Sequence, residues 1–122
     1  MGKLSFDQLT ELYILLSVDR IGPAKVRNLL AKFKDISNIL KANISDLMET
    51  EGISKELASR IRKSSLNKDS TRKLLEKEIK FLDKIGGRII TVWDNEFPQL
   101  LKKIYDPPLI LYVMGNFDEM DK

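Results

Sequence analysis

The segment from Phe97 to Gly115 constrains the fold of this chain more than any other stretch of its sequence. An aromatic-Pro pair opens an apolar helical pattern, which is followed by Asp106-Pro107-Pro108 and then by an almost continuous apolar run. Adjacent prolines fix the backbone φ angles and remove backbone donors, so a helix must end before them and a strand can begin only after them. The segment therefore predicts a short helix, a rigid corner and a buried strand, in that order.

Upstream of this segment, apolar residues recur with the spacing of amphipathic helices. Ser5 and Ser54 stand where they can cap two of these helices, and Pro23 stands at the first position of another. The longest helical pattern ends at Gly86-Gly87. Residues 1–87 are therefore predicted to be mainly helical, with short turns between the helices.

After residue 87 the period of the apolar residues changes. The β-branched run 89–93 predicts one strand, Pro98 opens a helix of about two turns, and the apolar run 109–113 predicts a second strand. A strand, a helix and a strand in this order favour a right-handed parallel crossover. Two strands alone are marginally stable, so this part is expected to need more sheet or a packing surface on the helices. The predicted fold class is α+β, mainly α.

The composition narrows the range of functions. The 122 residues include no Cys and no His, which excludes disulfides, thiolate metal sites and the commonest general base. No apolar run approaches the ~20 residues that a membrane-spanning helix needs. Asp94, Glu96 and Asp106 are the only carboxylates near a candidate cleft, and their spacing indicates turns rather than a metal or acid–base site. We therefore expect no catalytic residue, no cofactor and no metal.

The net charge of +3 is unevenly distributed along the chain. Residues 1–87 hold 17 Lys and Arg against 12 Asp and Glu, whereas residues 88–122 hold 4 against 6. A basic first part is compatible with contacts to phosphate groups. It is equally compatible with a lysine-rich surface that only faces solvent.

Two turns in the helical part, Arg20 to Val26 and Gly52 to Ala58, can be aligned with each other. Both resemble the helix-hairpin-helix pattern, in which two glycines flank an apolar residue at the start of a helix. Such a turn leaves backbone N–H groups at the helix N-terminus free to bind a phosphate of the nucleic-acid backbone. Neither copy is complete, because Arg20 replaces the first glycine of one turn and Ser54 the second glycine of the other.

The pattern predicts sequence-independent and salt-sensitive contacts to nucleic acid. The candidate binding residues are Gly22, Ala24, Lys25, Gly52, Ser54, Lys55 and Arg60. Pro23 removes one N–H donor from the first turn. The alternative is that both turns serve only to pack two helix pairs into a small five-helix bundle.

The C-terminal segment resembles the start of the core domain in the DNA-processing protein A family, also called DprA or Smf. The resemblance rests on an ordered motif formed by Phe97, Pro98, Asp106, Pro107, Pro108 and Gly115. Phe97 stands where that family more often has Tyr. The helical part, with its two incomplete hairpins, is similar to the SAM-like domain of the same family.

The resemblance implies three parts. Residues 1–66 are expected to form a SAM-like helix-hairpin-helix domain, and residues 67–87 a connecting helix packed on that bundle. Residues 88–122 are expected to form the first β-α-β portion of a truncated Rossmann-like domain. The family's main single-stranded DNA site lies in the core beyond this portion, so no DNA-binding residue of that site is carried over.

The resemblance also implies a function. The family mediates DNA recombination in bacteria: its members bind single-stranded DNA and help to load the RecA recombinase during natural transformation. This chain is expected to be a cytoplasmic, monomeric auxiliary module that contacts DNA or docks a protein, with no membrane partner. The alternative is a stand-alone, non-specific helix-hairpin-helix DNA-binding repair protein. A third class is a purely structural or regulatory interaction module.

Overall fold

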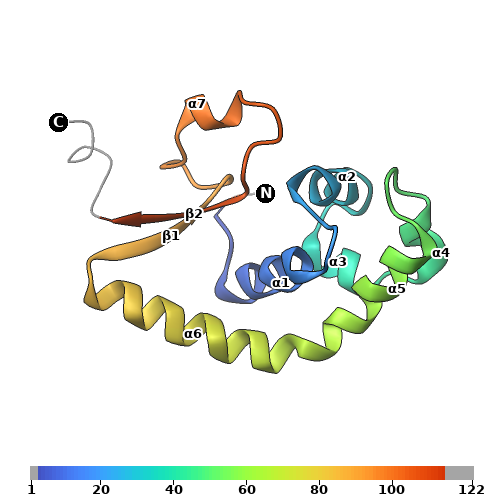
Figure 1. Ribbon diagram of the computed structural model, residues 1–122, viewed down its shortest axis with the longest axis horizontal. Coiled ribbons are helices and arrows are strands. Elements are labelled where there is room, and N and C mark those ends of the chain that lie inside the picture. Colours follow the sequence, from blue (N-terminus) through green and yellow to red (C-terminus); the bar gives the residue numbers. More distant parts are fainter. Residues whose placement is uncertain (1–2, 115–122) are drawn as a thin grey trace. The chain divides into compact units, whose positions relative to one another are not determined.

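The computed structural model describes residues 3–114 (Figure 1). The chain divides into a helical unit, residues 5–72, and a second unit that contains residues 73–114. The helical unit contains α1 (Phe6–Ser17), α2 (Pro23–Phe33), α3 (Ile36–Lys41), α4 (Ile44–Met48), α5 (Lys55–Ser64), the 3-10 turn η1 (Ser65–Asn67) and the start of α6 (Lys68–Lys84). The second unit continues α6 and adds β1 (Gly87–Thr91), α7 (Gln99–Lys102) and β2 (Ile110–Met114).

The helix starts follow from local capping chemistry. Ser5 and Gln8 form a reciprocal capping box, in which the Gln8 N–H donates to Ser5 Oγ at 3.1 Å and the Ser5 N–H donates to Gln8 Oε1 at 2.9 Å. Pro23 is the first residue of α2, and Ser54 Oγ caps α5 by accepting from the Leu57 N–H at 3.2 Å. These predicted starts are therefore confirmed.

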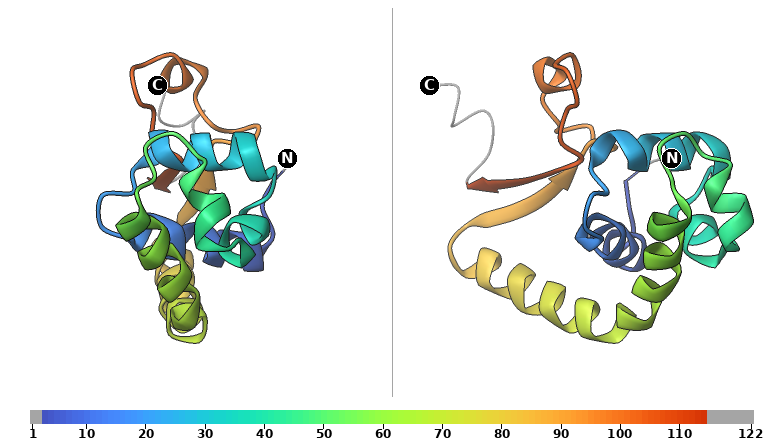
Figure 2. Two further views of the ribbon diagram at one scale, coloured as in Figure 1. Left: turned by 90° about the vertical axis from the view of Figure 1, so that its right-hand side faces the viewer. Right: turned by 45° about the vertical axis from the view of Figure 1, so that its right-hand side comes forward.

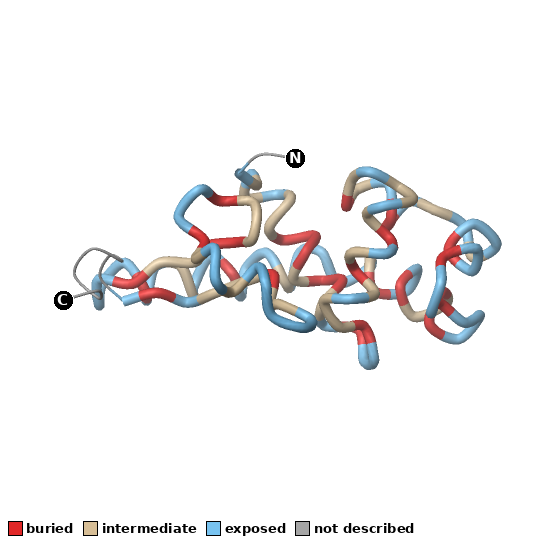
Figure 3. Tube along the Cα trace, turned by 90° about the horizontal axis from the view of Figure 1, so that it is seen from above, coloured by how far each residue is buried: buried red, intermediate tan, exposed pale blue. Residues whose placement is uncertain are grey.

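The core of the helical unit is formed by one apolar face from each of its helices. α3 is central, because it packs against α1, α2 and α5, while α4 packs against α5. Buried residues recur along the chain with helical spacing, which Figure 3 shows in red. The apolar side chains with at most 1% exposure in this unit are Leu12, Ile14, Leu15, Val26, Leu29, Ile36, Ile39, Leu47, Ala58 and Ile61. The five helices α1 to α5 thus share one core.

The second unit contains a two-stranded antiparallel sheet, so the predicted parallel crossover is wrong. β1 pairs with β2 from Gly87 opposite Met114 to Thr91 opposite Ile110. A parallel return would need a connection that runs back along the whole strand, and α7 covers only Gln99–Lys102. A helix of that length rises about 6 Å, whereas a five-residue strand spans about 17 Å. The connection therefore does not run back along β1, and β2 pairs with β1 in the antiparallel direction.

The segment around Phe97 packs against the β1–β2 sheet. Phe97 is 1% exposed and forms a core cluster with Ile90 and Val113. Asp94 shapes the turn before it, because Asp94 Oδ2 accepts from the Thr91 N–H at 2.7 Å. This is the turn role expected for Asp94. Gly115, the last residue of the sequence motif, lies outside the described residues. Across residues 3–114, none of the helices combines the length and apolar character of a membrane span.

Thr50 offers a test of the helical core. Its Oγ1 atom is buried and has no hydrogen-bond partner within the described residues. We expect Thr50→Val to raise the free energy of unfolding by about 1 kcal/mol, because it removes an unsatisfied hydroxyl at nearly constant volume. Thr10→Val is the matched control, since Thr10 is also buried and its Oγ1 donates to the Phe6 carbonyl at 2.9 Å. Urea denaturation followed by circular dichroism measures both, and equal effects of the two changes would contradict the expectation.

Candidate nucleic-acid interface

Two helical hairpins, α1–α2 and α4–α5, close through turns with the same backbone hydrogen bonds. Figure 2 shows the helices of both hairpins from two further sides, the first in blue and the second in green. Each residue of the first turn corresponds to the residue 32 positions later in the second. Three backbone hydrogen bonds recur at this offset. The N–H of Val18 donates to the Leu15 carbonyl at 3.2 Å, and that of Thr50 to the Leu47 carbonyl at 3.1 Å. The other two pairs are Ile21 to Val18 (3.1 Å) with Ile53 to Thr50 (3.1 Å), and Val26 to Gly22 (3.1 Å) with Ala58 to Ser54 (2.9 Å).

The turn requires a residue with positive φ at its first position. Arg20 has a φ of 70° and Gly52 a φ of 87°, so the arginine adopts the backbone that glycine adopts in the other copy. The next residue is a buried isoleucine in both copies, with 5% exposure for Ile21 and for Ile53. The incomplete glycine pattern therefore still produces two equivalent turns.

Each turn ends at a helix N-cap. Gly22 and Ser54 both have extended backbones there. The first N–H groups of a helix have no partner within the helix. In α2, Pro23 has no N–H, which leaves those of Ala24 and Lys25 at the start of the helix.

α5 presents a similar pair of donors. Ser54 Oγ is engaged with the Leu57 N–H, which leaves the N–H groups of Lys55 and Glu56 at the helix start. Ser54 therefore acts through its capping of α5, and not as a free hydroxyl beside the turn. Each hairpin thus offers a pair of adjacent N–H groups with a lysine in the same turn, the arrangement that binds a phosphate.

Reciprocal contacts join the two hairpins. The Lys25 ammonium donates to the Arg20 carbonyl at 2.9 Å, and its carbon chain crosses the second turn. The Lys25 Cε and Cγ atoms lie 3.6 and 3.7 Å from the position that a Cβ on Gly52 would occupy. Lys25 therefore belongs to both turns.

Two corresponding pairs of positions make further contacts between the hairpins. Arg60 of the second hairpin lies 3.8 Å from the Asp19 carboxylate of the first. At the equivalent positions, Asn28 Nδ2 donates to the Glu51 carbonyl at 3.3 Å. Sequence reasoning had not singled out Asp19, Asn28 or Glu51, although extending the 32-residue offset by a few positions would have found them.

The seven candidate residues do not all share one surface. Gly22, Ala24, Lys25 and Gly52 meet at the paired turns, as described above, and Lys55 begins the helix that follows the second turn. Arg60 stands five residues after Lys55, which places it about 140° around α5. Its guanidinium also pairs with the Glu56 carboxylate at 2.7 Å, so Arg60 already has ion-pair partners in this chain.

The two turns differ in charge. Residues 18–28 hold three basic side chains and one acidic, whereas residues 50–60 hold two of each. The first turn is therefore the more attractive to phosphate, although the second offers the better-capped helix. Within residues 3–114 there is no cluster of three or more acidic side chains that could hold a metal ion.

Comparisons with known proteins agree with this geometry. Residues 13–66 match the family model of the SAM-like helix-hairpin-helix tandem, and residues 88–122 match that of the DNA recombination-mediator protein A. Protein Smf of Synechocystis is 28% identical over 104 residues, which cover 85% of this chain and 25% of that protein. UvrABC system protein C of Clostridium perfringens is 45% identical over 56 residues, which cover 46% of this chain and 9% of that protein. No solved structure gives a significant match.

The positive φ of Gly52 gives a test of the turn. We expect Gly52→Ala to lower the free energy of unfolding by about 1–2 kcal/mol, because an L side chain is strained in this conformation. The space itself is adequate, since the nearest atoms lie at ordinary contact distance. Gly22→Ala is the control: its φ of −104° suits any residue and no atom lies within 4 Å, so a smaller loss is expected. Thermal denaturation compares the two, and a larger loss for Gly22→Ala would refute the assignment.

Proposed function

We propose a function from the premise that this chain belongs to the DNA-processing protein A family. It supplies an auxiliary, sequence-independent contact to the backbone of single-stranded DNA. The protein as a whole, by its family resemblance, binds single-stranded DNA and helps to load RecA in the bacterial cytoplasm during natural transformation. The chain itself performs no catalysis.

The observation that supports this proposal most directly is the duplicated turn. Each copy has two adjacent N–H groups without a partner inside the helix at a helix N-terminus, and a lysine in the same turn. A phosphate oxygen accepts hydrogen bonds from such N–H groups, and the positive end of the helix dipole adds to the attraction. Because the donors belong to the backbone and reach only phosphate, the contact carries no information about the base sequence.

The arrangement also limits the affinity of this part of the chain. One phosphate at each turn amounts to two phosphate contacts, which corresponds to a slope of about −1.4 in log K against log salt for a single strand. Affinity should then fall by about sevenfold between 50 and 200 mM salt. Such a contact assists a stronger site, so we expect the isolated chain to bind single-stranded DNA weakly.

Charge reversal at both turns tests the proposal. We expect Lys25→Glu combined with Lys55→Glu to reduce the affinity for an oligo-dT strand by about tenfold and to bring the salt slope close to zero. Fluorescence anisotropy at several salt concentrations measures both quantities. The control is Lys77→Glu combined with Lys80→Glu, which makes the same change in net charge at exposed positions of α6.

The outcome tests three points: the specific role of the turns, the DNA contact at the hairpins and the auxiliary role of the chain. Equal losses for the two double variants would show that only net charge matters, and the turns would then have no specific role. Unchanged binding in the turn variant would refute a DNA contact at the hairpins. A submicromolar affinity of the wild-type chain at physiological salt would refute its auxiliary role.

A second candidate, a stand-alone helix-hairpin-helix repair protein, has one observation in its favour. The similarity to UvrABC system protein C is confined to 46% of this chain. Residues 88–122 match the recombination-mediator family, and the stand-alone reading gives these residues no role. Deletion of residues 88–122 distinguishes the two candidates, because a stand-alone hairpin protein would keep its full DNA affinity and its function in cells.

A further inference from the structure

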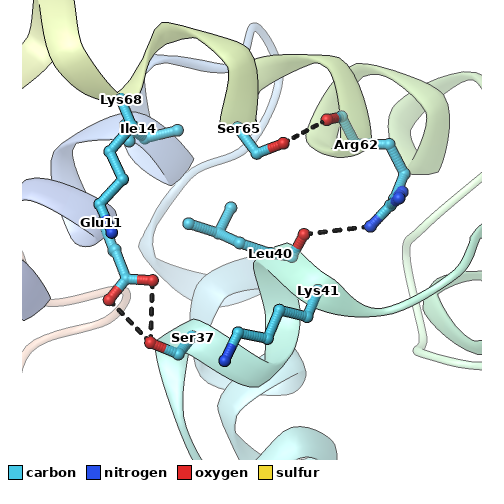
Figure 4. Close-up of a pocket in the computed structure, with 8 residues that line it drawn as sticks. All are labelled: Glu11, Ile14, Ser37, Leu40, Lys41, Arg62, Ser65 and Lys68. Carbon is cyan, nitrogen blue, oxygen red and sulfur yellow. Dashed lines mark hydrogen bonds between the residues drawn. The ribbon is translucent and has the colours of Figure 1, made fainter.

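A pocket of about 360 Å³ opens in the helical unit between α1, α3, α5 and the start of α6 (Figure 4). Its polar lining consists of Glu11, Ser37, Lys41, Arg62, Ser65 and Lys68. Arg62 and Ser65 lie at the end of α5 that is opposite the hairpin turn. The pocket is thus separate from the paired turns, and its volume falls within the range of small-ligand sites.

Glu11 lines this pocket with only 6% of its surface exposed. Its carboxylate oxygens lie 2.8 and 2.9 Å from the Ser37 hydroxyl, as the dashed lines in Figure 4 show. A hydroxyl has a single hydrogen, so Ser37 can satisfy only one of the two oxygens at a time. The Glu11 carboxylate makes no other hydrogen bond or ion pair within the described residues. A buried carboxylate with one donor has unused capacity for N–H donors.

The rim of the pocket has the opposite charge. Lys41, Arg62 and Lys68 are all exposed, and together with Glu11 they give the lining a net charge of +2. Arg62 is held at the rim, because its Nη1 donates to the Leu40 carbonyl at 3.3 Å. The cationic rim repels a basic peptide, and the Glu11 carboxylate repels a bare anion that comes close to it. A ligand that suits both must carry an anionic group at one end and N–H donors at the other.

We propose that this pocket binds a guanine nucleotide. Guanine is the one DNA base with two adjacent N–H donors, N1–H and the 2-amino group, on its pairing edge. A carboxylate accepts both at once, and at Glu11 this requires the Ser37 hydroxyl, which faces both oxygens, to turn aside. Adenine and cytosine place a ring acceptor beside their amino group, and thymine places a carbonyl on each side of its N–H. Either arrangement sets a lone pair against Glu11. The phosphate of the nucleotide then lies among Lys41, Arg62 and Lys68.

The first experiment uses the full chain and free nucleotides. Calorimetric titration with the four deoxynucleoside monophosphates should give an affinity for dGMP about tenfold higher than for the others, the discrimination that a bidentate base contact provides. Guanosine and inorganic phosphate should each bind more weakly than dGMP. Equal binding of all four nucleotides, or preferential binding of an arginine-rich peptide, would overturn the proposal.

The second experiment uses a matched pair of variants. Glu11→Gln should abolish the preference for dGMP, because an amide presents a donor to at least one of the guanine N–H groups. Glu49→Gln makes the same charge change on an exposed side chain outside the pocket and should keep the preference. Lys68→Ala, at an exposed position, should weaken dGMP but not guanosine. This last variant tests the pocket even if Glu11→Gln fails to fold.

Oligonucleotides distinguish a guanine within a DNA strand from a free guanine nucleotide. A dT strand with one central dG should bind more tightly than an all-dT strand if the guanine comes from DNA. Tight binding of dGMP without this difference would assign the site to a free guanine nucleotide. The hairpin turns contact only phosphate, which all four monophosphates share, so a preference for dGMP reports on the pocket alone. This proposal and the hairpin contact can therefore fail independently.

Discussion

The helical unit depends on one backbone turn that occurs twice. In each copy a residue with positive φ allows the chain to reverse, and the isoleucine after it is buried in the core. The following residue caps the next helix. The same three positions therefore reverse the chain, fill the core and set the direction of a helix N-terminus. A change at any of them alters packing and the presentation of N–H groups together.

The charged residues near these turns make contacts within the chain, whatever they contribute to binding. Arg60 joins Glu56 to Asp19, and Lys25 lies over Gly52 while its ammonium binds the Arg20 carbonyl. A basic residue in a motif is therefore not automatically available to a phosphate. The pocket near the other end of α5 differs in this respect, because its carboxylate is buried and has a single donor.

The sequence predicted the helical unit well because its signals are local. Caps, the proline at the start of α2 and the apolar spacing all act within a few residues, and the helix starts at Ser5, Pro23 and Ser54 were confirmed. The direction of the second strand was not predictable in this way. It depends on where an 18-residue connection returns, and the rigid corner at Pro107-Pro108 is compatible with either direction.

The candidate site was predictable only in part. The aligned turns identified where α2 and α5 begin, but side-chain contacts between the hairpins depend on their packing, which a pattern of Gly and Lys does not encode. The pocket around Glu11 draws its residues from five separate elements, and no spacing in the sequence links them. The assignment of seven candidate nucleic-acid-binding residues, like the three domain boundaries, stays a prediction.

The difference between Pro23 and Lys55 at the first helical position has a consequence for any strand that lies across both turns. One turn presents donors only from the second and third helical residues and has an excess of basic side chains, whereas the other presents them from the first and second and is neutral. The two ends of such a strand would meet chemically different surfaces. Because the two copies also differ at Arg20 and Gly52 and at Gly22 and Ser54, the duplicated motif is not symmetric.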